Sequence, residues 1–136
     1  LGPNRTVLKS DEMIKEVIFP KPNSNTKAAY IKLGLRNAMA ISVVSIAILM
    51  EMAGDACKKV RIGVGAVAPR PIRAYKVEEL LEGRKITEEL IKTCCEKIEK
   101  VVSPITDIRA SAEYRRSMAS VFLKRLIERV TAEERR

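Results

Sequence analysis

The sequence predicts an α+β fold, an antiparallel sheet of three or four strands with about three helices packed on one face. Two observations support this prediction. Segments in which apolar residues alternate with period 2 fill the first half of the chain, and segments with apolar residues at helical spacing fill the second half. Strands that precede helices, instead of alternating with them, are typical of a sheet covered on one side.

The change from strand to helix falls in the stretch 60–74, VRIGVGAVAPRPIRA. One apolar face of a strand is predicted for Val60, Ile62, Val64, Ala66 and Ala68. Gly63 and Gly65 within this strand indicate a close approach to the backbone or a bend. Pro69 and Pro71 should end the ladder because proline has no backbone N–H to donate.

A turn at Gly54-Asp55 separates the strand just described from further predicted strands that precede it. Residues 27–36 alternate in polarity. Residues 40–52 are almost wholly apolar, which leaves strand and helix open, but their β-branched residues favour a strand. Short alternating runs at 5–8 and 13–19 predict two more strands, and the polar run 21–26 is a candidate domain boundary.

Three helices follow the prolines. The first covers 76–81 and stops at Gly83. The second is capped by Thr87 and the third by Ser111. The predicted buried face of the third helix consists of Met118, Ala119, Phe122, Leu123, Leu126, Ile127 and Val130. The acidic pairs Glu78-Glu79 and Glu88-Glu89 are explained by the helix dipole.

Composition excludes some classes of function. The chain has no histidine, which argues against self-contained catalysis. Its net charge of +9 is spread along the chain, and few aromatic residues are available for stacking, so a solvated basic surface is favoured over nucleic-acid binding. The apolar run 40–52 is too short to span a bilayer. Cys57, Cys94 and Cys95 lack metal-ligand spacing and fit a reducing compartment, so we expect a cytoplasmic protein.

Two motifs could carry chemistry. The run Gly63 to Ala68 matches G-x-G-x-x-A, but prolines follow it where a dinucleotide site needs a helix, so tight strand packing is the better interpretation. Lys32 and Arg36 lie on the polar side of the predicted strand 27–36. They form either a solvated strand face or a pair of cations that reaches an anionic cofactor.

Three stretches together resemble one family. They are LGPNRTVLKSDEMIKEVIFP at the start, VRIGVGAVAPRPIRAYKVEELLEG in the middle and DIRASAEYRRSMASVFLKRLIERV near the end. The chain is similar to the FAD-binding medium subunit of the molybdenum hydroxylases, which include carbon monoxide, xanthine and nicotinate dehydrogenases.

The resemblance implies an oxidoreductase subunit in which FAD passes electrons from [2Fe-2S] clusters to an acceptor. Residues 1–26 would be the C-terminal end of an FAD-binding domain and a linker, and residues 27–136 the flavoprotein C-terminal domain. FAD would contact Ile14 and Lys32, or Ile31 in place of Lys32. The family's glycine-rich FAD loops are absent from this sequence, so we expect a piece of a longer polypeptide that is inactive alone.

The implied partners are an iron-sulfur small subunit and a molybdenum large subunit that carries molybdopterin, assembled as a possible homodimer of heterotrimers. No nucleic acid and no membrane span are expected. The alternative is a non-catalytic basic interaction module that binds nucleic acid or an acidic protein.

Overall fold

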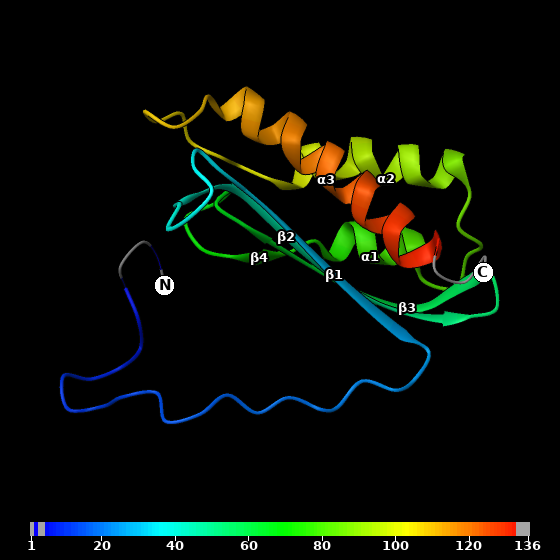
Figure 1. The fold of residues 1–136 in the computed structure, drawn as a ribbon, viewed down its shortest axis with the longest axis horizontal. Coiled ribbons are helices and arrows are strands. Elements are labelled where there is room, and N and C mark those ends of the chain that lie inside the picture. Colours follow the sequence, from blue (N-terminus) through cyan, green and yellow to red (C-terminus); the bar gives the residue numbers. More distant parts are fainter. Residues whose placement is uncertain (1, 3–4, 133–136) are drawn as a thin grey trace.

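Strands followed by helices build the α+β architecture that the sequence predicts (Figure 1). The computed structural model describes residue 2 and residues 5–132. The four strands form one antiparallel sheet in the order β1-β2-β3-β4. They are β1 (Thr26–Gly34), β2 (Ser42–Ala53), β3 (Ala56–Gly65) and β4 (Ile72–Arg73). The helices are α1 (Tyr75–Leu81), α2 (Glu88–Val101) and α3 (Ala112–Ala132).

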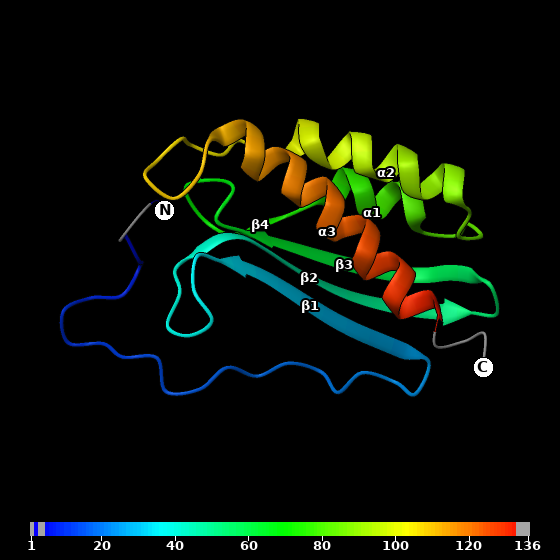
Figure 2. The ribbon, with the colours of Figure 1, turned by 45° about the horizontal axis from the view of Figure 1, so that its top comes forward.

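All three helices lie on the same face of the sheet (Figure 2). The core fills the space between the two layers, because alternate side chains of β2 and β3 point toward the helices. The largest fully buried side chains are Ile46, Ile48, Met50, Ile62, Leu81, Ile98, Leu123, Leu126, Ile127, Val43, Val44 and Val60. The opposite face of the sheet carries no helix in the described part of the chain.

Local signals place the helix ends as predicted. The Thr87 hydroxyl accepts a hydrogen bond from the Leu90 N–H at 3.2 Å, and the Ser111 hydroxyl accepts one from the Tyr114 N–H at 3.1 Å. Gly83 ends the turn after α1 with φ +75°. Cys94 is buried in the core and Cys95 packs against it, as expected for small apolar residues. None of the helices among the described residues has the length and apolarity needed to cross a membrane.

The end of β3 differs from the prediction. Val60, Ile62 and Val64 are buried, but Ala66 and Ala68 are not, and Val67 takes the next core position. Ala66 adopts the left-handed conformation at φ +62°, which breaks the alternation. The strand therefore ends at Gly65, and the chain returns past the prolines to pair β4 with β3.

The predicted strands at 5–8 and 13–19 are wrong for this structure. Both segments are extended or bent chain without a ladder, although Arg5 makes an isolated bridge to Gly2. The apolar side chains in them are largely exposed. A strand needs a neighbouring strand to satisfy its backbone groups, and this segment runs apart from β1 in both views (Figures 1 and 2).

The edge of β3 is closed by side chains of α1 and of the residue that follows it. A carboxylate oxygen of Glu78 accepts a hydrogen bond from the Ile62 N–H at 2.8 Å, and Glu82 accepts one from the Val60 N–H at 3.1 Å. Glu78 also binds the Arg73 guanidinium. Burial raises the pKa of Glu78, but the hydrogen bonds from Arg73 and Ile62 outweigh it, so the pKa lies below its ordinary value. The helix dipole alone therefore does not explain Glu78.

Candidate functional site

Lys32 lies on the face of the sheet away from the helices. Its neighbours Ile31 and Leu33 pack against the core, so the alternation of β1 turns the Lys32 side chain to the open side. Lys32 pairs across the sheet with Ser45, and Ser45 pairs with Gly65. The row Lys32–Ser45–Gly65 therefore offers an exposed cation beside a hydroxyl.

The sheet itself explains one of the two glycines in β3. A Cβ atom at Gly65 would lie 2.6 Å from the Ser45 hydroxyl oxygen, so a side chain there would force this hydroxyl out of its position. A Cβ atom at Gly63 would meet nothing within 4 Å. Sequence analysis left open a close approach or a bend at these glycines, and among the described residues a close approach exists at Gly65 and not at Gly63.

Behind this end of the sheet, a buried arginine joins three segments. Arg115 of α3 is only 3% exposed. Its Nη1 donates to the Val43 carbonyl at 2.7 Å and to the Ala66 carbonyl at 3.2 Å. Arg115 thus fixes the start of β2 and the turn after β3, which flank the row that contains Lys32.

Asp107 neutralises this arginine from the loop between α2 and α3. It accepts hydrogen bonds from Arg115 Nη2 at 2.7 Å, from the Arg109 N–H at 2.8 Å and from Arg109 Nη1 at 2.7 Å. The Arg109 backbone N–H contributes most to lowering the pKa of Asp107, to about 2, with further help from Arg115. Asp107 is therefore ionised at neutral pH and holds the arginine pair in place.

Arg36 does not share the site with Lys32. Strand β1 ends at Gly34, so Arg36 lies in the following loop and not on the polar side of the strand. Its guanidinium donates to the Met39 carbonyl at 2.6 Å through Nη2 and at 3.2 Å through Nε. Arg36 closes its own loop, in which Met39 has φ +49°.

Ile14, the other predicted site residue, lies in the segment that runs apart from the sheet. Its side chain is 66% exposed. This structure therefore does not bring Ile14 and Lys32 together. Each is an accessible group, one apolar and one cationic, that a further polypeptide or a cofactor could contact.

The side chains of the open face offer recognition of an anionic group. Within the described ranges, no cluster of histidine, cysteine or carboxylate side chains could hold a metal ion. Lys32 and the Ser45 hydroxyl could bind one anionic group but could not enclose a cofactor.

Sequence analysis missed Arg115 and Asp107 as residues that organise the site. A signal for Arg115 was present, because it lies four residues before Ala119 and so on the buried stripe of α3. A charged residue on such a stripe needs a buried partner. No comparable pattern marks Asp107, whose partners come from tertiary contacts.

A solved structure of carbon monoxide dehydrogenase from Hydrogenophaga pseudoflava, in a form that lacks the Mo-pyranopterin moiety of its cofactor, contains a chain that is similar throughout. The TM-score is 0.90 at 29% identity, over 97% of this chain and 46% of that chain. The carbon monoxide dehydrogenase medium chain of the same organism is 28% identical over 93% of this chain and 44% of its own length.

A second relative is the xanthine dehydrogenase FAD-binding subunit of Escherichia coli O157:H7. It is 26% identical over 96% of this chain and 45% of its own length. The chain thus spans less than half the length of these relatives. Residues 29–130 match the CO dehydrogenase flavoprotein C-terminal domain family, and the chain belongs to that family.

Proposed function

We propose that this chain is the C-terminal part of the FAD-containing subunit of a molybdenum hydroxylase, an oxidoreductase. In the whole enzyme, electrons would pass from [2Fe-2S] clusters through FAD to an acceptor. The observation that carries the proposal is the structural match over 97% of the chain to carbon monoxide dehydrogenase. FAD supplies the redox chemistry when it is bound. The residues of this chain position and shield the FAD. The chain alone is inactive.

The proposed domain division follows the start of the sheet. Residues 1–26 are the end of an FAD-binding domain and a linker, and residues 27–136 are the flavoprotein C-terminal domain. Two facts support this division. Strand β1 begins at Thr26, and the apolar side chains between 7 and 19 lie outside the core of the sheet domain.

Ile14 and Lys32 are the residues proposed to contact FAD. Lys32 supplies a cation beside the Ser45 hydroxyl, which suits an anionic group such as a phosphate. Ile14 supplies an exposed apolar surface that a ring system could cover. Neither residue can hold the cofactor without the FAD-binding half.

The proposed partners are an iron-sulfur small subunit and a molybdenum large subunit with molybdopterin, in a homodimer of heterotrimers. The relatives that name a medium chain support a multi-subunit enzyme. We also propose a cytoplasmic location. Three cysteines without a disulfide suit a reducing compartment.

The experiment measures flavin in the visible spectrum. The chain is mixed with FAD and with a second polypeptide that comprises the part of the Hydrogenophaga pseudoflava medium chain outside the match. A flavin band at ~450 nm should elute with the complex and not with the chain alone. Lys32→Ala should lower the flavin content of the complex by about tenfold if the cation binds a phosphate.

Lys76→Ala is the matched control, because Lys76 is an exposed lysine on α1. It should leave the flavin content unchanged. Equal flavin content in the Lys32 and Lys76 variants would remove Lys32 from the cofactor site. A complex that never retains flavin would contradict the proposed function.

A further inference from the structure

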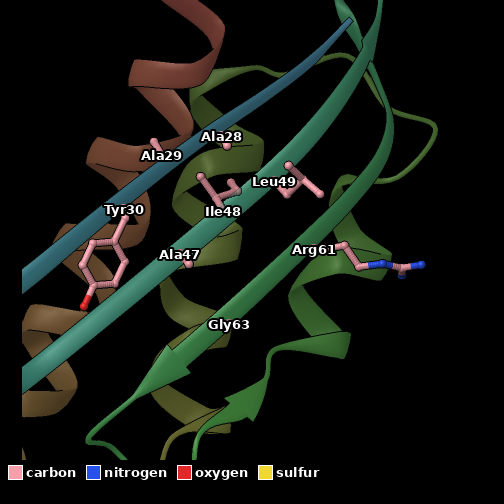
Figure 3. A pocket seen from close by; sticks show the side chains of 8 residues that line it. All are labelled: Ala28, Ala29, Tyr30, Ala47, Ile48, Leu49, Arg61 and Gly63. Atoms are coloured by element: carbon pink, nitrogen blue, oxygen red, sulfur yellow. The ribbon is translucent and has the colours of Figure 1, made fainter. Parts of the chain in front are cut away.

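The two edges of the sheet differ in how the chain covers them. At the β3 edge, carboxylates of Glu78 and Glu82 accept from backbone N–H groups that β4 does not reach. At the other edge, β1 has a ladder with β2 on one side and no strand on the other in the described part of the chain. Figure 3 shows this margin, with Tyr30 on the outermost strand and Ala47 on the strand next to it. The open edge is nine residues long.

Most of the devices that protect a strand edge from pairing are missing from β1. A natural edge is protected by proline, by bulges, by short length or by charged side chains. Strand β1 contains no proline, and its register with β2 shifts only at its end, between Leu33 and Gly34. Its charged side chains are Lys27 and Lys32. A lysine disfavours pairing chiefly where it faces another lysine, so the register of the pairing decides whether this protection acts.

One register keeps the lysines apart when β1 pairs with β1 of a second copy. In an antiparallel ladder centred on Tyr30, all nine residues of both strands are paired, and each lysine faces an apolar side chain. A shift by one residue would set core-facing side chains opposite outward-facing ones, and a shift by two would shorten the ladder. The pairs of the centred ladder are Thr26 with Gly34, Lys27 with Leu33, Ala28 with Lys32, Ala29 with Ile31, and Tyr30 with itself.

The apolar side chains of β1 gain contacts in this register. Ala29, Ile31 and Leu33 pack against the core of their own copy but are only partly buried. Because Ala29 lies opposite Ile31 of the second copy, each copy would cover the margin of the other's core. On the open face, the Tyr30 ring is 56% exposed and would lie beside its own counterpart, and cross-strand aromatic pairs are favourable.

We infer that the β1 edge binds β1 of a second copy of this chain, antiparallel and centred on Tyr30, so that one sheet continues through both copies. The strand fits itself, because no lysine faces a lysine and core-facing residues meet core-facing residues, as a two-fold symmetric contact requires. The edge is accessible, since the segment before Thr26 runs apart from β1 in both views (Figures 1 and 2). The inference uses only the sheet and does not depend on the proposed function.

Opposite charges introduced at Ala28 test the register. Ala28 is exposed and would face Lys32 of the second copy, and this pair occurs twice in the symmetric dimer. By sedimentation equilibrium of the 136-residue chain at low salt, Ala28→Lys should raise the dimer Kd by about tenfold, and Ala28→Glu should lower it by about tenfold. Both shifts should shrink at high salt. A folding defect could not produce the tighter dimer expected for Ala28→Glu.

The matched controls are Ala53→Lys and Ala53→Glu. Ala53 is exposed on β2 but lies beyond the ladder with β1, in which the first residue, Thr26, pairs with Glu51. The same two charge changes at this position should leave the dimer Kd unchanged.

A disulfide tests the centre of the contact. Tyr30 lies on the two-fold axis, so a cysteine introduced by Tyr30→Cys would face itself with Cα atoms ~4.5–5.5 Å apart, within the range that a disulfide spans. The background is Cys95→Ser, which leaves only the buried native cysteines. In a glutathione redox buffer, the Tyr30→Cys chain should form a covalent dimer, and the Ala53→Cys chain should stay monomeric under denaturing conditions.

The remaining outcomes overturn the inference. A chain that stays monomeric at every concentration has no such contact. A dimer whose Kd responds alike to the Ala28 and Ala53 variants, or that forms no disulfide at position 30, is held by another surface. Open-ended growth instead of a dimer also overturns the inference, because the symmetric pairing occupies the open edge of both copies. Flavin content is not used in these measurements, so the proposed function stands or falls separately.

Discussion

Arg115 shows how a single side chain can hold one end of the sheet. Its guanidinium bonds two carbonyl groups from different strand ends and a carboxylate from the loop before α3. Its Nε has no hydrogen-bond partner among the described residues. A buried charge with this many contacts fixes the position of these segments more than it stabilises the fold, because desolvation offsets much of the attraction.

Replacing Arg115 by methionine should nevertheless be strongly destabilising. The change leaves the Val43 carbonyl without this donor and removes one of the donors to Asp107, which keeps those of Arg109. A buried acceptor left without its donor costs about 1–3 kcal/mol. The measurement is the urea midpoint of the chain. Arg125→Met, on the exposed side of the same helix, should stay within about 0.5 kcal/mol of the wild type. Similar midpoints for the two variants would show that Arg115 is dispensable for folding.

Asp107 should make stability depend on pH in the acid range. Its pKa is about 2 in the folded chain against an ordinary value of 3.8, so its ionised form stabilises the fold above pH ~4. This contribution is lost as the pH falls through ~2, when the folded carboxylate takes up its proton. The difference in urea midpoint between wild type and Asp107→Asn should therefore be large at neutral pH and shrink toward pH ~2.

The control for this pH series is Asp11→Asn, in the exposed segment before the sheet. It should leave the midpoint close to that of the wild type. A constant difference between wild type and Asp107→Asn across the range would show that Asp107 does not couple protonation to folding.

At the scale of elements, side chains of α1 and of the residue after it bind the part of the β3 edge that the short strand β4 does not reach. Strand β4 pairs with only Gly63 and Val64, and the carboxylates of Glu78 and Glu82 accept from the next N–H groups along β3. An exposed strand edge is a site for unwanted pairing, and covering it with a helix removes that risk.

Glu78→Ala should lower stability by about 1–3 kcal/mol, because it leaves the buried Ile62 N–H without an acceptor. Hydrogen exchange at the Ile62 amide should accelerate in the same variant. Glu79→Ala is the neighbouring exposed control and should change stability by less than about 0.5 kcal/mol. An unchanged exchange rate at Ile62 would mean that another group closes this edge.

The elements that the sequence predicted well are those with strong local signals. The apolar alternation of 60–64 and the caps at Thr87 and Ser111 act within a few residues, and the structure confirms them. Residues 13–19 carry an equally regular alternation yet form no strand, because pairing depends on a neighbour that the pattern does not contain. The register that places Lys32 beside Ser45, and the contacts of Asp107, likewise follow from tertiary structure.

At the scale of the whole molecule, the described chain has two parts with different burial. The sheet and helices enclose a continuous core, whereas the segment before Thr26 exposes Val17, Ile18 and Phe19, each by at least 75%. An exposed apolar run of strand-like pattern is typical of a surface that meets another polypeptide. The domain division at residue 26 remains a prediction, and amide exchange can test it.

The amides of residues 13–19 should exchange near the unprotected rate in the chain alone, because the structure gives them no ladder. The amides of Ile46 and Ile48, in the central strand, should exchange only through global unfolding. Adding the part of the Hydrogenophaga pseudoflava medium chain that lies outside the match should slow exchange at 13–19 by at least about tenfold, since a strand that gains a neighbour gains hydrogen bonds. Protection at 13–19 in the chain alone would show pairing within one copy or between copies, and the segment would then belong to the sheet domain instead of to an FAD-binding domain.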